Sequence, residues 1–131
     1  MSPVSPAELQ VATVIPVSDM DRSRAFYEQT LGLAGAAVGG GHLLRAGDGA
    51  LLYLLENAGY AGQAGWPLAS FQADDLPATV ADLRRRGVTL EVMDDDPPWR
   101  TDERGIADFG DVLLAWFRDP DDQVISVSQP V

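Results

Sequence analysis

One pattern of secondary structure occurs twice along this 131-residue chain, at an offset of about 56 residues. The first copy has an apolar strand, then Asp19-Met20 at the start of a predicted helix, and Gly32 at its end. The second copy has an apolar strand, then Asp75-Leu76, and Gly87. Three short strands are predicted after each helix. Because aspartate caps a helix start and glycine tolerates the left-handed conformation that ends one, both copies predict the same fold.

Neither copy can bury its sheet alone, because a helix covers one face of a sheet and leaves the other in water. We therefore expect an α+β fold in which two βαβββ modules form a curved, barrel-like mixed sheet around a cleft, with the helices outside. Residues 1–131 are predicted to be a single domain, with module one at about 9–56, a glycine-rich linker at 57–67 and module two at about 68–129. Such a cleft is the default ligand site.

Periodicity and turn residues set the expected boundaries of the elements. Residues 1–8 have two prolines and no periodicity, and we expect a frayed arm there. The helices are predicted at Met20–Leu31 and Leu76–Arg86. The strands are predicted at 9–17, 35–38, 42–46, 50–56, 68–73, 89–93, 113–118 and 124–128, and a long acidic loop at 94–111.

Composition excludes several classes of function. The chain has no cysteine, which excludes disulfide scaffolds and thiolate metal sites, and one histidine, which excludes a multi-histidine metal site. The net charge of −11 repels phosphate backbones and anionic membranes, so we expect no nucleic-acid and no membrane partner. No apolar run reaches the ~18 residues that span a bilayer, and residues 1–10 lack the features of a signal peptide, so a cytoplasmic protein is expected.

Three motifs carry a family resemblance, and they follow one another along the chain. They are Val17–Tyr27 with Leu31-Gly32-Leu33, then Asp74-Asp75-Leu76, then Phe117–Ile125. In this order they resemble the vicinal oxygen chelate (VOC) superfamily, which holds glyoxalase I, bleomycin-resistance (bleomycin-binding) proteins and extradiol dioxygenases. The resemblance covers about Leu9 to Gln129 and implies the paired βαβββ fold. One departure is Asp122-Gln123, where the family usually has Gly-Asn.

The resemblance also implies where a metal would be held. Members of the family place metal ligands at four strand positions, which fall here at Ala12, Tyr53, Leu68 and Ser126. A divalent ion needs carboxylate or imidazole donors, usually three or more of them from the protein in a catalytic site. Because methyl, phenol, isobutyl and hydroxymethyl groups do not supply such donors, we expect no metal and no cofactor.

Aromatic side chains are the candidate ligand contacts. Trp66 and Trp99 lie in the two predicted long loops. Loops run over the surface, so the packing of a core does not explain a large apolar side chain there. Trp116 lies in a predicted strand. Tyr53 is at one of the strand positions where the family places a metal ligand, so its side chain is expected to point into the cleft. The alternative for each is structural, since aromatic side chains also fill cores and dimer interfaces.

Polar candidates are fewer. Glu56, at the end of a strand, and Arg45, in a hairpin, are the expected polar anchors for a ligand, while Arg118 matches Arg45 in the second hairpin. Ion pairing at the surface is the competing role for the arginines. His42 suits acid–base chemistry at neutral pH, but we interpret it as an exposed or hydrogen-bonded loop residue. The run Asp94–Asp96 is interpreted as a solvated loop that could also attract a cation.

These observations predict a metal-independent protein that binds a small organic molecule, aromatic or cationic. The bleomycin-binding branch of the family implies sequestration of a drug or metabolite, and it implies a homodimer. No catalytic residue is assigned. Three alternatives stay open: a metal-dependent lyase, isomerase or dioxygenase with atypical ligands, a metal-free isomerase that uses Glu56 or Tyr53, and a structural or regulatory subunit without a ligand.

Overall fold

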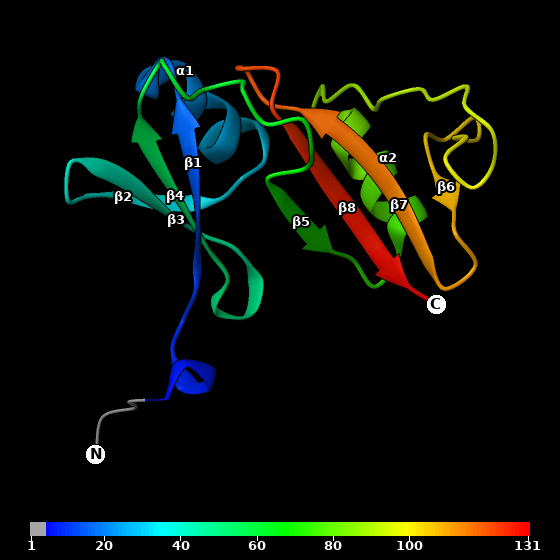
Figure 1. The fold of residues 1–131 in the computed structure, drawn as a ribbon, viewed down its shortest axis with the longest axis horizontal. Coiled ribbons are helices and arrows are strands. Elements are labelled where there is room, and N and C mark those ends of the chain that lie inside the picture. Colours follow the sequence, from blue (N-terminus) through cyan, green and yellow to red (C-terminus); the bar gives the residue numbers. More distant parts are fainter. Residues whose placement is uncertain (1–4) are drawn as a thin grey trace. The chain divides into compact units, whose positions relative to one another are not determined.

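The computed structural model describes residues 5–131 and contains two compact units. The first unit ends at Tyr60 and the second begins at Ala61. Each unit has one four-stranded sheet and one main helical segment that follows the first strand of that sheet (Figure 1). The chain is therefore an α+β protein built from two modules.

The strands of the first unit are β1 (Ala12–Val17), β2 (Ala34–Val38), β3 (Gly41–Arg45) and β4 (Leu51–Glu56). They form a sheet in the order β1-β4-β3-β2, in which β1 is parallel to β4 and the other pairs are antiparallel. After β1, the helix α1 (Met20–Arg24) continues directly into the π-helix η2 (Ala25–Thr30). Two short 3-10 turns, Pro6–Glu8 and Gly47–Gly49, complete the unit.

The elements of the second unit are β5 (Ala69–Gln72), α2 (Leu76–Arg85), β6 (Ala107–Asp108), β7 (Val112–Arg118) and β8 (Val124–Pro130). Its sheet has the order β5-β8-β7-β6, in which β5 is parallel to β8 and the other pairs are antiparallel. The first strand of each unit thus pairs in parallel with the last strand of that unit. This common order confirms the repeat that the sequence predicts.

Local signals in the sequence set the ends of the helical segments as expected. Asp19 accepts a hydrogen bond from the backbone N–H of Arg22 at 3.2 Å, and Asp75 accepts one from Ala78 at 3.1 Å. These bonds satisfy donors that a helix start leaves unpaired. Gly32 and Gly87 both have a positive φ, +83° and +86°.

Each sheet has one face covered by its own helical segment and one face that is not. In the first unit, the buried side chains of Ile15, Leu44 and Leu54 lie on the face that packs with fully buried Tyr27. Because side chains alternate along a strand, their neighbours lie on the other face, where Val14 is 56% exposed. We call this second face of each sheet the helix-free face.

The second unit repeats this arrangement. Ala115, Phe117 and Ile125 are buried on the face that α2 covers, together with Leu76 and Val80 of that helix. Burying such side chains contributes roughly 1.5–3 kcal/mol each, so this core stabilises the unit without disulfides. No helix of residues 5–131 combines the length and the apolarity that a membrane crossing requires.

The predicted strand at 89–93 is wrong. Only Leu90 forms a β-bridge there, to Phe117, and the strand that pairs with Leu113 and Leu114 of β7 is β6, inside the segment predicted as one long loop. A tight turn brings β6 back to β7, because Asp102 accepts hydrogen bonds from the N–H groups of Arg104 and Ile106 at 2.8 and 3.0 Å. Segment 89–93 meets the same edge of β7 farther along the strand, but only through the Leu90 bridge and the Glu91 N–H, which donates to Trp116 O at 2.8 Å.

Two other boundaries also differ from expectation. The predicted α-helix over Met20–Leu31 is α-helical only to Arg24, and its second half is a π-helix in which Leu31 N–H donates to Phe26 O at 2.9 Å. The strand predicted from Leu9 begins at Ala12, which pairs with Leu51 at the start of β4, and Pro6–Glu8 form a 3-10 turn. Residues 1–4 of the predicted frayed arm lie outside the described residues.

Candidate functional site

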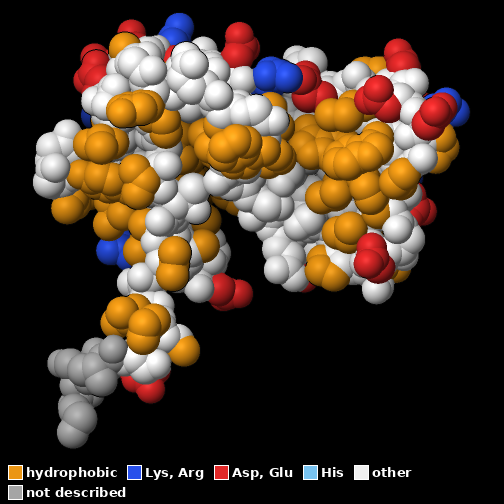
Figure 2. Space-filling model, viewed as in Figure 1, with side chains coloured by type: hydrophobic (Ala, Val, Ile, Leu, Met, Phe, Trp, Pro, Cys, Tyr) orange, Lys and Arg blue, Asp and Glu red, His pale blue; other side chains and the backbone are white. Residues whose placement is uncertain are grey.

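Three aromatic rings of the second unit come together on its helix-free face. The Trp99 and Trp116 rings are stacked, with centroids 6.1 Å apart and planes 29° apart, and Phe109 meets Trp99 edge-on at 5.0 Å. Both geometries are favourable for aromatic pairs. We call Trp99, Phe109 and Trp116 the aromatic platform. Figure 2 shows apolar side chains gathered over this part of the second unit.

The two tryptophans differ in exposure. Trp116 is 4% exposed and lies on β7, whose paired neighbours fix its position, whereas Trp99 is 52% exposed and lies in the loop after Met93. That loop is closed by Thr101, whose N–H donates to Met93 O at 3.0 Å and whose hydroxyl accepts from Met93 N–H at 2.9 Å. A rigid buried indole therefore supports a half-exposed one.

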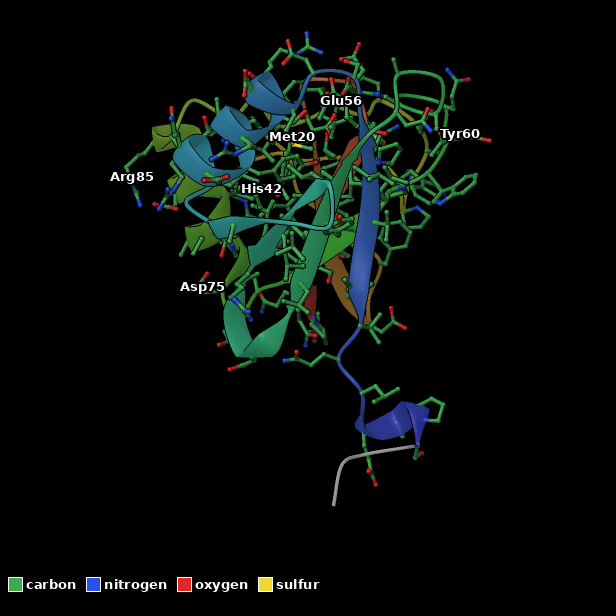
Figure 3. The ribbon with its side chains drawn as sticks, turned by 90° about the vertical axis from the view of Figure 1, so that its left-hand side faces the viewer. Met20, His42, Glu56, Tyr60, Asp75 and Arg85 are labelled. Atoms are coloured by element: carbon green, nitrogen blue, oxygen red, sulfur yellow. The ribbon has the colours of Figure 1, made fainter. Side chains whose placement is uncertain are left out.

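The candidates of the first unit do not all share one face. Tyr53 is half-buried on the helix-free face, and its hydroxyl donates to Val38 O at 2.6 Å with a second contact to Gly39 O at 3.1 Å. Arg45 is exposed and shares that face by register. Glu56, three residues after Tyr53 on the same strand, points to the opposite face and is exposed (Figure 3). The structure therefore places Tyr53 with Arg45 and apart from Glu56.

The loop candidates and Arg118 lie at the surface of the second unit. Trp66 is 66% exposed and makes no ring contact with another residue of the described chain. Asp94–Asp96 are all exposed. Arg118 donates from Nε to Glu91 Oε1 at 2.6 Å and from Nη1 to Asp122 O at 2.8 Å, which ties its guanidinium group to the hairpin between β7 and β8.

The interpretation of His42 as a loop residue is wrong. It lies on β3, is 5% exposed, and its Nε2 is 2.6 Å from Glu28 Oε1, although the atoms lack hydrogen-bond alignment. The Arg24 guanidinium, hydrogen-bonded to Glu28 at 2.9 Å, outweighs partial desolvation and holds the pKa of that carboxyl below its usual value, with His42 as a smaller contributor. Sequence reasoning missed Glu28, because only the fold brings η2 against β3.

Comparison with known proteins gives the family. The model of the glyoxalase/bleomycin resistance protein/dioxygenase superfamily matches residues 9–127. This chain belongs to that superfamily. No curated protein matches the chain.

Among solved structures, this member of the superfamily is similar to TnmS3, an antibiotic binding protein from Streptomyces sp. CB03234. The two are 25% identical, with a TM-score of 0.66 and coverage of 98% of this chain and 100% of TnmS3. A glyoxalase/bleomycin resistance protein from the same organism is 25% identical, with a TM-score of 0.62 over 92% of this chain and 100% of its own. A virulence protein from Salmonella typhimurium shares the fold, at 22% identity, a TM-score of 0.65, and coverage of 95% and 97%.

The four strand positions at which the sequence resemblance implies metal ligands hold poor donors in this chain. Ser126 is 4% exposed and pairs in register with Trp116 and with Ser70, so hydroxyl and indole groups surround that position. Tyr53 has its hydroxyl on backbone carbonyls, and Ala12 and Leu68 are aliphatic. Within the described part of the chain, no group of three or more His, Cys, Asp or Glu side chains is arranged to hold a metal ion. The residues present do not fit a divalent ion.

Proposed function

We propose that this protein binds a planar aromatic small molecule on the aromatic platform, without a metal, and thereby sequesters it. The observation that carries the proposal is the half-exposed Trp99 ring, stacked on the buried Trp116 ring. An exposed apolar surface of this kind is costly in water and marks a contact site when it is held rigidly. The family and the likeness to an antibiotic binding protein support a small-molecule ligand.

The platform is suited to a flat ring system. Trp116 fixes one face of Trp99, so the outer face of Trp99 is presented before a ligand arrives, and little conformational entropy is lost on binding. A planar ligand would extend the stack and cover apolar surface that now faces water. Stacking of one ring on an exposed aromatic side chain contributes roughly 1–3 kcal/mol.

Charge favours a neutral or cationic ring over an anionic one. The exposed run Asp94–Asp96 precedes Trp99 on the same loop, and the whole chain carries −11. Such a field raises the local concentration of cations, although salt weakens it beyond about 8–10 Å. We therefore propose a neutral or cationic ligand, and the lack of metal donors at the superfamily positions supports binding without a metal.

The remaining predicted contacts are proposed as separate candidates, each on its own unit. Tyr53 offers the ring rather than its hydroxyl, which already donates to Val38 O. On the second unit, Trp66 offers an exposed indole. On the first unit, Arg45 offers an exposed charge on the face of Tyr53, and Glu56 offers one on the opposite face. We also propose a cytoplasmic homodimer, as the bleomycin-binding branch implies.

The test compares two tricyclic probes of similar shape and opposite charge by isothermal titration calorimetry. Proflavine is cationic, and anthracene carboxylate is anionic; we expect saturable binding of proflavine and weaker binding of the anion. Trp99→Leu keeps an apolar side chain on Trp116 but removes the ring, so it should weaken proflavine by about tenfold or more. Trp99→Phe keeps a smaller ring and should retain most of the affinity.

The matched control is Tyr60→Leu, which removes another exposed aromatic ring, 70% exposed, outside the platform. It should leave the affinity within about twofold of the native value. Equal losses in Trp99→Leu and Tyr60→Leu, or no binding of either probe, would overturn the proposal. Stoichiometric metal in the protein after incubation with zinc, nickel, iron and manganese and then desalting would overturn the metal-independent part and favour an enzyme.

A further inference from the structure

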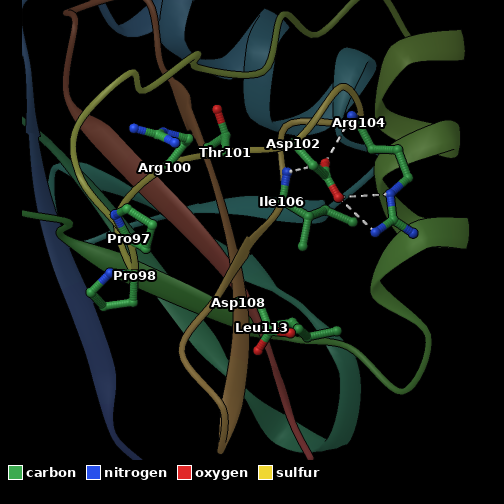
Figure 4. Close-up of a pocket in the computed structure, with 9 residues that line it drawn as sticks. All are labelled: Pro97, Pro98, Arg100, Thr101, Asp102, Arg104, Ile106, Asp108 and Leu113. Atoms are coloured by element: carbon green, nitrogen blue, oxygen red, sulfur yellow. Dashed lines mark hydrogen bonds and ion pairs between the residues drawn. The ribbon is translucent and has the colours of Figure 1, made fainter.

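A hollow of about 320 Å³ lies in the second unit, and Pro98 and Arg100, the chain neighbours of Trp99, are among the residues that line it (Figure 4). Leu113 lines it, and Leu113 and Trp116 are three residues apart on the regular strand β7, so their side chains point to opposite faces of the sheet. The other side of the hollow is formed by Pro97 and Pro98. The volume lies at the lower end of the range of small-molecule sites.

The lining combines an apolar surface with balanced charge. Ile106 and Leu113 join the two prolines as apolar surface. The charged groups are two guanidinium groups and two carboxylates, those of Arg100, Arg104, Asp102 and Asp108. The formal charges of these four lining groups cancel, and Arg100 Nη2 also lies 3.9 Å from Asp96 Oδ1 outside the lining, so the lining itself carries no net charge within a strongly acidic chain.

One ion pair fixes a wall of the hollow. Arg104 donates from Nε and Nη2 to Asp102 Oδ2 at 3.0 and 2.7 Å, while Asp102 Oδ1 accepts from the backbone N–H groups of Arg104 and Ile106. Partial burial opposes ionisation of Asp102, but these bonds outweigh it and hold its pKa below the usual value. Arg104 is thereby held in one orientation.

Hydrogen-bonding capacity remains on both kinds of group. Within residues 5–131, no hydrogen bond is made by Nη1 of Arg104 or Nη1 of Arg100, whose Nε donates to Asp95 O at 3.1 Å. Asp108 accepts from Gly110 N–H at 2.8 Å through Oδ1, which leaves Oδ2 as an acceptor. The hollow thus presents donors and an acceptor beside an apolar surface.

We propose that this hollow is a second binding site, for a neutral polyhydroxylated ring of monosaccharide size. A hydroxyl group both donates and accepts, so such a ligand can use the arginine donors and the Asp108 acceptor without adding charge. Its C–H face would pack on Pro97, Pro98 and Leu113. Binding here needs no metal and is distinct from binding at the aromatic platform, because the proposed ligand has no aromatic ring to extend the stack of Trp99 and Trp116.

The test is an NMR titration of the full-length, isotope-labelled protein with D-glucose, D-mannose and myo-inositol. We expect saturable shifts of backbone amides in 100–108 with at least one polyol. Arg100→Met removes one guanidinium but keeps an apolar stem, and it should weaken that polyol by about fivefold or more. Arg85→Met removes an exposed α2 arginine, 71% exposed, and should leave the titration unchanged.

Three results would overturn the proposal. The first is no saturable shift in 100–108 with any of the polyols. The second is saturation of those amides by isovalerate or butylamine with no response to polyols, which would indicate an anion or cation site. The third is an equal response of the native protein and Arg100→Met.

Discussion

Gln123 joins two separate segments of the second unit, and its removal gives the sharpest prediction about stability. Its side chain is 2% exposed, donates from Nε2 to Asp119 Oδ2 at 2.9 Å, and accepts from Gly62 N–H through Oε1 at 3.1 Å. Asp119 is itself 4% exposed. One amide therefore supports a buried carboxylate and holds the loop that leads to Trp66.

The magnitude follows from these two bonds. Gln123→Ala removes a hydrogen bond to a charged group, worth roughly 1.5–3 kcal/mol, and a neutral one, worth roughly 0.5–1.5 kcal/mol. We therefore expect the free energy of unfolding to fall by about 2–4.5 kcal/mol. Gln123→Asn introduces the residue that the superfamily usually has, but it is one methylene shorter, so it should keep only one of the bonds and cost about half as much.

Urea unfolding followed by circular dichroism measures the loss, and amide hydrogen exchange shows where it occurs. In Gln123→Ala, the Gly62 amide should exchange much faster than in the native protein, because its acceptor is gone. Gln63→Ala, a change at an exposed neighbour, serves as the control and should alter stability by less than about 0.5 kcal/mol. A loss below about 0.5 kcal/mol in Gln123→Ala, or unchanged Gly62 exchange, would refute the reasoning.

Two further predictions concern the first unit. A Cβ on Gly35 would lie 2.7 Å from His42 Nε2, so Gly35→Ala should lower the free energy of unfolding by about 1–3 kcal/mol, measured by thermal unfolding. The control is Gly47→Ala, where a Cβ would meet no atom within 4 Å and the change should be nearly neutral. Similar losses in both variants would contradict the close packing at Gly35. The pKa of Glu28 is lowered on folding, mainly by Arg24, so its contribution to stability is present above the unfolded value of about 4.5 and is lost as pH falls through the folded one. Glu28→Gln should therefore lose less stability than the native protein between neutral and acidic pH, and an identical pH dependence would contradict this assignment.

The helix boundaries could be predicted because their signals are local. Asp19 and Asp75 cap the helices through bonds to residues three positions later, and Gly32 and Gly87 adopt the left-handed conformation just after the helical segments. These interactions join residues that are close in the sequence, so they can be predicted without knowledge of the fold. The repeat of such signals was therefore sufficient to predict two equivalent modules.

The missed strand shows what local signals leave open. Segment 89–93 and segment 106–108 could both have paired with the free edge of β7, and the apolar pattern favours the first. The turn held by Asp102, together with Gly105 at a φ of +89°, returns the chain to β7 and pairs the second segment with Leu113 and Leu114, while the first segment keeps a single bridge to Phe117. Which segment pairs with a given strand edge is decided by tertiary contacts, and the apolar periodicity of a sequence does not predict those contacts.

The candidate site was predictable by residue type but not by contact. Loop position identified Trp99 and strand position identified Trp116, yet their stacking depends on how the loop closes at Thr101. His42 shows the opposite case, since the three glycines before it suggested a loop and the structure buries it beside Glu28. The spacing of residues in the sequence does not predict that Glu28 lies beside His42, because the fold brings them together.

The two modules place different side chains at equivalent positions, and this difference explains where the platform forms. By register, Tyr53 pairs with Leu43 in the first sheet, as Ser126 pairs with Trp116 in the second. In the first sheet the large ring is on the last strand, and its hydroxyl bonds to the backbone of the β2–β3 turn. In the second sheet that position holds a small serine, so the indole of Trp116 can lie buried on the neighbouring strand and support Trp99. The small side chain of Ser126 and the aromatic surface beside it are therefore two features of the same local packing.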